Sequence, residues 1–450
     1  MKNINSSISS TDINYTPICT GAFGLKMVAG STGLPVGIIS KMVSGRSVFP
    51  GCGIRKISGS SGLLTDTLIL LHSSGPVFSS WFLPIILFFF LLFPEPLNSQ
   101  GRNTGWEIFR GNPALTGVTR EAIPQSPRSL WTFEIGDEIK SSPVISNSRI
   151  IIGSGDGYVY CLDMQGKLLW KFDSGNTIEA PALIHNQKVY IGNLGGSLYS
   201  LEISTGNVVW EYTTDNQIMA TPNIWSDGKT ELLLIGSYDY YLHAVNPKDG
   251  SMVWKYELFN YLNAAVAIEN DKAIFGGCDG LLHIVDIRTG KPGEAMEIAS
   301  YVAGSASLEN GRAYVGDYDG RFTAADYING KILWTWEDKE RNLPFIASPS
   351  IFENKVIIGN RDRFVYCYNK TTGEVLWRTN TGSRVDASTL TDGKRVLVAN
   401  MRGDILLLDI NTGNRQWSFE TGSPISGSPA ISEGKIIIGT NDGTIWCFGN

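Results

Sequence analysis

A phrase of about 40 residues recurs eight times between Ser141 and the C-terminus, and this repeat constrains the fold more than any other feature. Two of its fullest copies end in Ala244–Trp254 and Ala324–Trp334. A period in this range is typical of solenoids and propellers, in which one repeat cannot bury its apolar face alone. Because equivalent repeats form a scaffold, we expect function to come from residues that depart from the repeat.

The first unit shows the strand pattern of every repeat. Short segments rich in β-branched residues indicate four strands, at residues 142–145, 149–153, 158–163 and 167–172. Asp156-Gly157 and Gln165-Gly166 separate them as tight turns, because glycine accepts positive φ without steric cost. No part of the repeat region has a sustained 3.6-residue period. The sequence therefore predicts an all-β fold, a β-propeller of four-stranded antiparallel blades.

The number of blades follows from the turns between the second and third strands. There are eight of them: Asp156-Gly157, Gly195-Gly196, Asp239-Tyr240, Asp279-Gly280, Asp319-Gly320, Asp362-Arg363, Arg402-Gly403 and Asp442-Gly443. The eighth unit ends at Asn450 without a fourth strand, whereas Ser129–Phe133 resembles a fourth strand with nothing before it. We expect this N-terminal strand to complete the last blade and close the ring, leaving no bare edge.

Charge and cysteine usage exclude several classes of function. Residues 101–450 hold 31 of the 37 basic and 40 of the 43 acidic residues, and this acidic region has no basic cluster. We therefore expect no nucleic-acid partner. The six cysteines include no adjacent pair and no Cys-x-x-Cys, and there are only four histidines, so no metal-binding pattern is visible. Cys161, Cys367 and Cys447 occupy one third-strand position and are expected to be buried.

The first hundred residues differ from the repeats. Residues 1–75 are rich in Ser and Gly and predict a disordered or mis-annotated leader, followed by a signal-peptide-like apolar segment at 76–100. Its apolar run, Trp81–Phe93, is short for a membrane-spanning helix. We expect cleavage near Gln100 and export to the periplasm or cell envelope, with a retained membrane anchor at residues 81–93 as the alternative. A lead-in at 101–128 then precedes the propeller at 129–450.

Two motifs of this chain, the recurring tryptophan phrase and the lead-in, resemble those of a known superfamily. The phrase Ala-x-Asp/Asn-x-x-x-Gly-x-x-x-Trp resembles the tryptophan-docking motif of the PQQ-like β-propeller superfamily, which includes quinoprotein alcohol dehydrogenases and the BamB lipoprotein of outer-membrane assembly. Trp106–Asn112 is similar to the lead-in of its non-enzymatic members. The resemblance implies a WD40-like ring in which each tryptophan packs between blades. The structural docking residues would be Trp131, Trp170, Trp210, Trp254, Trp334, Trp377 and Trp417, with Glu294 in the corresponding place of the fourth unit.

The resemblance also allows an enzyme to be considered. Quinoprotein dehydrogenases hold PQQ over a tryptophan and under a disulfide between adjacent cysteines, with Ca²⁺ held by carboxylates and an aspartate as the base. This chain has no adjacent cysteines. Asp317 and Asp319 lie on repeat turns, where aspartate is expected to bond the local backbone. We therefore expect no catalytic residues, no cofactor and no metal.

The run before each first strand, at the axial mouth, differs in every unit. This candidate partner-binding mouth comprises Lys140, Glu179, Met219, Asn263, Tyr301, Phe345, Arg384 and Asp386, together with Ser426. A solvated ring of loops is the simpler interpretation. The charged loop Trp336–Pro344 and the aromatic residues Tyr256, Phe259 and Tyr261 are two further candidate surfaces.

These observations favour a non-catalytic, exported propeller that binds a protein partner, as in BamB-like envelope or outer-membrane assembly. A PQQ-dependent oxidoreductase or PQQ-binding protein is one alternative. The sensory ectodomain of a membrane-anchored protein is another.

Overall fold

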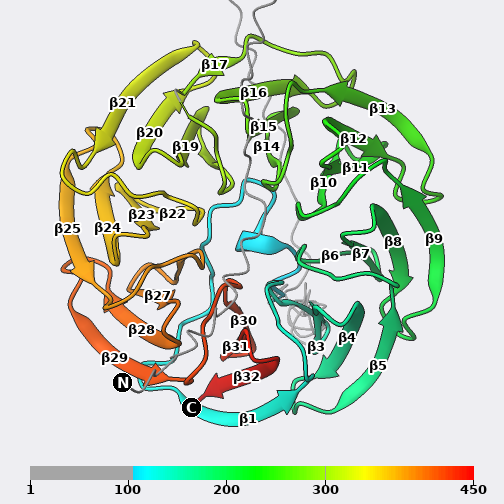
Figure 1. The fold of residues 1–450 in the computed structure, drawn as a ribbon, viewed down its shortest axis with the longest axis horizontal. Coiled ribbons are helices and arrows are strands. Elements are labelled where there is room, and N and C mark those ends of the chain that lie inside the picture. Colours follow the sequence, from blue (N-terminus) through cyan, green and yellow to red (C-terminus); the bar gives the residue numbers. More distant parts are fainter. Residues whose placement is uncertain (1–104, 299) are drawn as a thin grey trace, which may run out of the picture. The chain divides into compact units, whose positions relative to one another are not determined.

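The computed structural model describes residues 105–298 and 300–450, which fall within the unit Arg102–Asn450. Eight four-stranded antiparallel sheets surround a central axis, so the all-β, eight-bladed propeller is confirmed (Figure 1). The predictions for residues 1–75, 76–100 and Trp81–Phe93 and for cleavage near Gln100 lie outside the described residues. Within the described ranges, no helix is long and apolar enough to span a bilayer.

The strands of the first four blades are β2 (Val144–Ser146), β3 (Arg149–Gly153), β4 (Tyr158–Asp163), β5 (Leu168–Asp173), β6 (Leu183–His185), β7 (Lys188–Gly192), β8 (Ser197–Glu202), β9 (Val208–Thr213), β10 (Asn223–Ser226), β11 (Glu231–Gly236), β12 (Tyr241–Val245), β13 (Met252–Glu257), β14 (Ala267–Glu269), β15 (Lys272–Gly276), β16 (Leu281–Asp286) and β17 (Met296–Glu297). Those of blades five to seven are β18 (Ser307–Glu309), β19 (Arg312–Gly316), β20 (Arg321–Asp326), β21 (Lys331–Glu337), β22 (Ser350–Phe352), β23 (Lys355–Gly359), β24 (Phe364–Asn369), β25 (Val375–Asn380), β26 (Leu390–Thr391), β27 (Arg395–Ala399), β28 (Asp404–Asp409) and β29 (Arg415–Glu420). The eighth blade contains β30 (Ala430–Ser432), β31 (Lys435–Gly439), β32 (Thr444–Gly449) and β1 (Arg128–Glu134).

The eighth blade is completed by the N-terminal strand, as the sequence predicts. Strand β1 pairs antiparallel with β32, and Thr132 faces Trp446 in this register. The two ends of the repeat region therefore meet in one sheet, and no blade is left with an unpaired third strand. Buried strand faces form the apolar core between neighbouring blades, where the inner and central strands are almost wholly buried.

Tryptophans of the outermost strands contact the turn glycine of the next blade. A Cβ built on that glycine would lie within 3 Å of the indole at Gly166 against Trp131, Gly206 against Trp170, Gly250 against Trp210, Gly290 against Trp254, Gly373 against Trp334 and Gly413 against Trp377. Each of these indoles also donates its Nε1–H to a backbone carbonyl of the next blade, at 2.9–3.1 Å. The glycines have positive φ, so a side chain there would be strained as well as crowded.

The fourth blade departs from this pattern. Its outer strand β17 is two residues long, and exposed Glu294 stands where the other blades have tryptophan. Gly330, the turn glycine of the fifth blade, accordingly has no atom within 4 Å of a built Cβ. Lys291-Pro292-Gly293 interrupts the strand, because proline cannot donate to the ladder.

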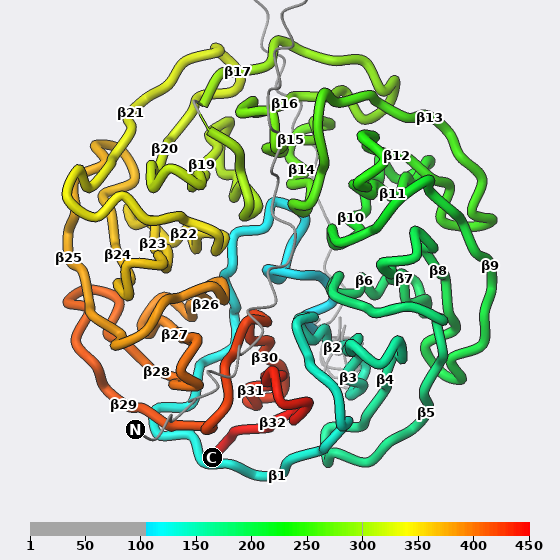
Figure 2. Tube along the Cα trace, in the orientation of Figure 1, coloured from blue at the N-terminus to red at the C-terminus, as the bar shows by residue number. Residues whose placement is uncertain are grey.

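The lead-in contacts all eight blades. Figure 2 shows it crossing the centre of the ring. Backbone or side-chain hydrogen bonds join it to the blades in turn, at Ile145, Ile184, Asn223, Ile268, Leu308, Ile351, Thr391 and Gly434. The lead-in therefore acts as a second closure of the ring, independent of β1.

Arg110, within the 3-10 turn η1 (Phe109–Gly111), fixes the lead-in at the axis. Its side chain is 2% exposed, and its guanidinium donates to the carbonyls of Pro349 and Thr389 and to Ser350 Oγ. Burial lowers the pKa of Arg110 to about 9. Gly117 makes room for it, since a Cβ there would lie 1.9 Å from Nη2.

Candidate functional site

One face of the ring carries the turns between second and third strands together with the loops that enter each blade. A backbone hydrogen bond joins turn and loop in every blade, from Gly155 N to Glu138 O in the first and from Asn441 N to Pro424 O in the eighth. We call this surface the loop face. All the mouth residues proposed from the sequence lie on the entering loops or directly after them.

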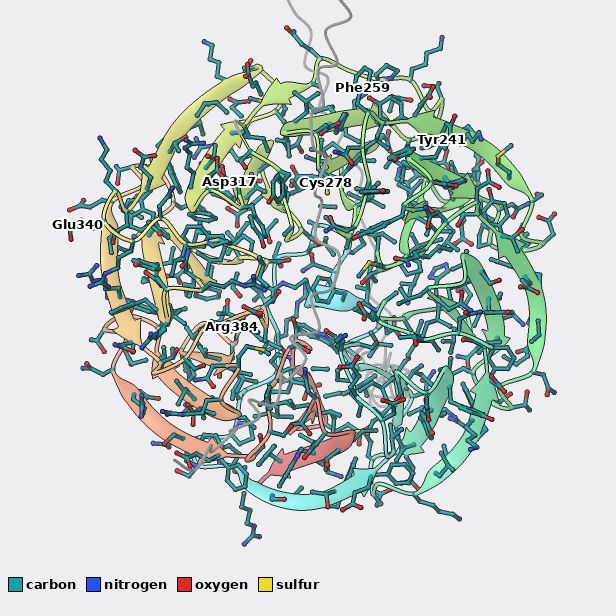
Figure 3. All side chains as sticks on the ribbon, in the orientation of Figure 1. Tyr241, Phe259, Cys278, Asp317, Glu340 and Arg384 are labelled. Carbon is teal, nitrogen blue, oxygen red and sulfur yellow. The ribbon has the colours of Figure 1, made fainter. Side chains whose placement is uncertain are left out.

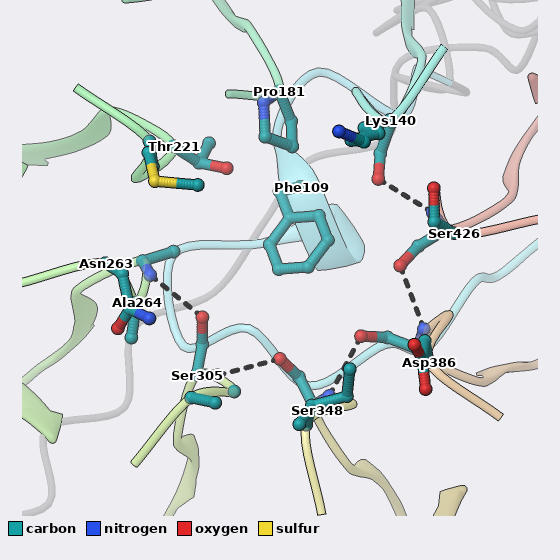
Figure 4. Close-up of a pocket in the computed structure, with 18 residues that line it drawn as sticks. Phe109, Lys140, Pro181, Thr221, Asn263, Ala264, Ser305, Ser348, Asp386 and Ser426 are labelled. Carbon is teal, nitrogen blue, oxygen red and sulfur yellow. Dashed lines mark hydrogen bonds between the residues drawn. The ribbon is translucent and has the colours of Figure 1, made fainter. Parts of the chain in front are cut away.

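A cavity of about 170 Å³ opens along the axis, and we call it the axial pit. Its wall includes one residue from the entering loop of each of seven blades: Lys140, Met219, Asn263, Ala303, Ile346, Asp386 and Ser426. Phe109 of the lead-in projects into it (Figure 4). Of the nine residues predicted at the mouth, the structure brings five into this wall: Lys140, Met219, Asn263, Asp386 and Ser426.

A belt that is mostly serine also lines the axial pit. The Oγ atoms of Ser305, Ser348, Ser388, Ser428 and Ser142 each accept the backbone N–H of the equivalent residue in the preceding blade, at 2.8–3.0 Å. Pro181, Thr221 and Ala265 take this position in the second to fourth blades. The belt joins adjacent inner strands, so its primary role is to hold the ring together.

The charges beside the axial pit are paired. Lys140 Nζ lies 2.7 Å from Glu138 and 3.0 Å from Glu179, so Glu179 faces its neighbour rather than the cavity. Asp386 binds Arg361 with both oxygens, at 3.1 and 3.0 Å. Arg384 Nε approaches the same carboxylate at 3.5 Å from an exposed position nearer the axis than Glu340 (Figure 3). Arg384 thus shares a carboxylate that Arg361 already occupies.

Phe345 is not a mouth residue, and the prediction was wrong by one position. Its side chain is fully buried and lies over Gly316, where a Cβ would be 2.3 Å away. Ile178, Ile218 and Val385 cover the corresponding glycines of other blades. Because side chains alternate across an extended segment, the next residue, Ile346, faces the pit instead. Tyr301 is likewise outside the pit wall, which contains Ala303, and it stacks on Tyr318.

A cluster of aromatic residues on the loop face lies at the third and fourth blades. The Tyr261 ring lies between Tyr238 and Tyr240, with centroids 4.6 and 5.1 Å apart and nearly parallel planes. Phe259, on the same loop, is 90% exposed. We call Tyr238, Tyr240, Phe259 and Tyr261 the aromatic patch. Tyr256, proposed with them from the sequence, instead packs inward against Phe275 and bonds His283 Nδ1 at 3.2 Å.

Tyr240 has a backbone conformation that its repeat equivalents achieve with glycine. Its φ is 71°, and Arg363 of the sixth blade, at 78°, is the other non-glycine at this turn position. The remaining six turns have glycine here. A bulky residue in the left-handed region costs about 1–2 kcal/mol, so these two turns are strained relative to the six that have glycine. The Asp-Tyr and Asp-Arg turns are visible in the sequence as departures from the turns that end in glycine.

Asp317, considered from the sequence as a candidate acid, is a buried turn residue. Its Oδ1 accepts the Arg321 N–H at 2.8 Å, whereas Oδ2 has no hydrogen-bond partner. Asn193, Asn360 and Asn400 hold the equivalent position, and each donates Nδ2–H to a carbonyl. Burial raises the pKa of Asp317 to about 6.

A family model described as outer membrane protein assembly factor BamB matches residues 122–336, 238–363 and 361–449. Together these cover more than half of the chain, which therefore belongs to this family of PQQ-like β-propellers. Among curated proteins, the chain is 30% identical over 109 residues to the human β-alanine-activating enzyme and 27% identical over 101 residues to BamB from Burkholderia pseudomallei. The matches cover 23% and 22% of this chain but only 10% and 26% of those relatives.

Solved structures agree in fold. BamB from Moraxella catarrhalis superposes with a TM-score of 0.62 at 18% identity, over 72% of this chain and 98% of that one. Quinohemoprotein alcohol dehydrogenase from Comamonas testosteroni gives 0.65 at 13% identity, over 78% and 82%. At these identities the likeness shows the fold alone, and it includes an enzyme as well as an assembly factor.

The residues of the axial pit do not fit a quinone and its metal as the resemblance describes them. The sequence has no adjacent cysteines. In the described part of the chain, no three His, Cys, Asp or Glu side chains gather as a metal site would require. The pit wall has Asp386 as its carboxylate, and that carboxylate is already bound by Arg361.

Proposed function

We propose that this chain is a non-catalytic propeller of the cell envelope that binds a protein partner through the aromatic patch of its loop face. Membership of the BamB family supports a role in outer-membrane assembly. The main support for this binding surface is that Phe259 is 90% exposed beside three stacked tyrosines. Large aromatic residues dominate binding energy at protein interfaces, because they bury much area at a low entropic cost.

The strained turn at Tyr240 gives this surface a second support. Replacing Tyr240 with the glycine of the other turns would relieve the backbone, and yet the tyrosine is present with its ring 42% exposed. Tyr261 stacks against it from the next blade, so the ring is held in one orientation before any partner arrives. Pre-organisation of this kind reduces the entropy lost on association.

A photoreactive amino acid placed at position 259 in the native host tests the proposal. We expect one envelope protein to be crosslinked and identified by mass spectrometry. Ile328 is the matched control, because it is 67% exposed and lies in a turn between third and fourth strands, away from the loop face. Identical crosslinks from both positions would contradict the proposal. Tyr240→Gly should weaken the crosslink at 259 without loss of stability.

Export is part of the same proposal. N-terminal sequencing of the protein from its native host should find a first residue between about 95 and 105, as expected for a cleaved signal segment. An intact Trp81–Phe93 segment in the membrane fraction would instead support an anchored ectodomain.

A further inference from the structure

We propose that a groove between the fifth and sixth blades binds an acidic, partly apolar peptide segment. This inference rests on the proposed function, since it gives the chain a second contact surface for protein and names the chemistry that fits it. The groove, of about 640 Å³, is lined by Glu340, Arg341, Asn342, Leu343, Asp362, Arg363, Phe364 and Asn380. We call it the arginine groove. Glu340 lies at the outer rim of the ring (Figure 3).

The loop that forms one wall of the groove is longer than its equivalents. Residues 338–349 separate β21 from β22, whereas nine residues, such as 174–182, separate the corresponding strands elsewhere. Hydrogen bonds fix this loop: Asn342 N donates to Asp338 O at 3.0 Å, and Asn360 Nδ2 donates to Leu343 O at 2.9 Å. The inserted loop therefore forms a wall that hydrogen bonds hold in place, and Leu343 on this wall is 45% exposed.

The other wall contains the second strained turn of the loop face. Arg363 has a φ of 78° where six of the eight turns have glycine. The acidic side chain beside it faces inward, because Asp362 Oδ1 accepts the Phe364 N–H at 2.9 Å and Oδ2 accepts the Tyr366 hydroxyl. Arg363 thus stands exposed at a position that favours glycine, next to a carboxylate that is already occupied.

Within residues 105–298 and 300–450, two guanidinium groups of the groove have no acidic partner. Among the described residues, no carboxylate lies within ion-pair distance of Arg341 or Arg363. Arg341 lies over the Phe364 ring instead, 5.0 Å from its centroid. Guanidinium binds carboxylate with paired, charge-assisted hydrogen bonds.

The apolar and acidic residues of the groove restrict the chemical class of peptide that can bind. Leu343 offers an exposed apolar contact beside the arginines, which suits a leucine-sized side chain next to the carboxylate. Exposed Glu340 at the rim disfavours a uniformly acidic ligand by like-charge repulsion. A segment that alternates single carboxylates with apolar residues fits both features.

The test uses a dye-labelled octapeptide of alternating glutamate and leucine, with glutamine in place of glutamate as the control peptide. Binding to the full chain is followed by fluorescence anisotropy at low and high salt. We expect the glutamate peptide to bind more tightly than the glutamine peptide, with a difference that shrinks as salt rises. Arg363→Gly should weaken glutamate-peptide binding about tenfold, the loss of one charge-assisted contact. Its melting temperature should be unchanged or higher, because glycine relieves the left-handed backbone.

Two matched variants separate charge from geometry. Arg415→Gln removes an exposed charge from β29 outside the groove and should leave binding unchanged. Arg363→Lys keeps the charge but loses the paired hydrogen bonds, so it should give an intermediate affinity. Equal affinity for both peptides, or full binding by Arg363→Gly, would overturn the proposal. Displacement by inorganic phosphate at peptide-like concentrations would also overturn it, by showing an anion site without peptide selectivity.

The experiments can refute the proposal for the aromatic patch and the proposal for the arginine groove independently. Peptide binding that depends on Arg363, in a protein whose position 259 crosslinks no envelope partner, would retain the groove and remove the proposed function of the aromatic patch. A specific crosslink at 259 without selective peptide binding would do the reverse.

Discussion

The two sides of the fourth blade show how an interface tolerates the loss of its tryptophan. On the entry side, Trp254 of the third blade lies over Gly290 and donates to Ile287 O at 2.9 Å. On the exit side, Glu294 replaces the tryptophan and Gly330 has open space around it. The fourth and fifth blades nevertheless each form a complete four-stranded sheet. The tryptophan therefore adds stability to an interface that the inner strands already specify, which leaves the outer strand free to vary.

The largest expected effect comes from removing the strand that completes the eighth blade, because the lead-in is then the remaining closure of the ring. Deletion of residues 129–135 removes β1 and with it the contact of Trp131 with Gly166. We expect a loss of cooperative unfolding and of more than about 5 kcal/mol, a large part of a typical domain's stability. Thermal denaturation followed by circular dichroism measures it, and an unchanged melting temperature would refute this account of closure.

The entry side should depend strongly on its tryptophan. Trp254→Ala removes a half-buried indole and its hydrogen bond, so we expect a loss of about 3 kcal/mol. Glu294→Ala on the exit side is the control and should change stability by less than about 0.5 kcal/mol, because the carboxylate is exposed. Urea denaturation of both variants gives the comparison, which fails if the two losses are similar.

The turn glycines Gly290 and Gly330 give a second comparison of the two sides of the fourth blade. Gly290→Ala would place a Cβ 2.7 Å from Trp254 at a φ of +68°, whereas Gly330→Ala meets no atom within 4 Å at a φ of +63°. We expect the free energy of unfolding to fall by about 3 kcal/mol for Gly290→Ala and by about 1 kcal/mol for Gly330→Ala, since only the backbone strain is common to both. In a Trp254→Ala background, the cost of Gly290→Ala should fall toward that of Gly330→Ala. Equal costs in the wild-type background would show that the indole does not confine the glycine.

The smallest effect concerns the pH dependence of the fifth blade. The pKa of Asp317 is about 6 in the folded protein, above its ordinary value of 3.8, because burial disfavours the carboxylate. The folded state therefore keeps a proton that the unfolded chain has lost between these values. Stability falls as pH rises through this window, and the penalty is fully present at pH 7.

Asp317→Asn removes that penalty and adds an amide donor, as in Asn193, Asn360 and Asn400. We expect a gain of about 2 kcal/mol at pH 7 that falls as the pH approaches 4, where only the contribution of the amide donor remains. Chemical denaturation at several pH values measures the gain. A gain that does not change with pH would mean that ionisation of Asp317 is not its source.

The repeat made the blades predictable because their determinants are local. Turn glycines, the alternation of apolar residues and the cap at Asp163, which accepts two backbone N–H groups of its own turn, all act within a few residues. The missing fourth strand of the last unit was equally visible, so the pairing of β1 with β32 followed from the sequence.

The candidate site was less predictable, because its residues are placed by contacts between blades. The predicted mouth residue Phe345 lies one position before Ile346, which lines the pit, and one position reverses which side of an extended backbone faces the cavity. The stack of Tyr238, Tyr261 and Tyr240 joins two blades, and nothing local to either segment indicates it.

By itself, the sequence determined the fold class, the number of blades and the closing strand, since each depends on short-range patterns repeated eight times. Only the tertiary structure decided where the lead-in runs, that Arg110 binds Thr389 at a separation of 279 residues, and which arginines lack acidic partners. Those facts depend on distances between residues far apart in the chain, which the closure of the ring sets and no local pattern records.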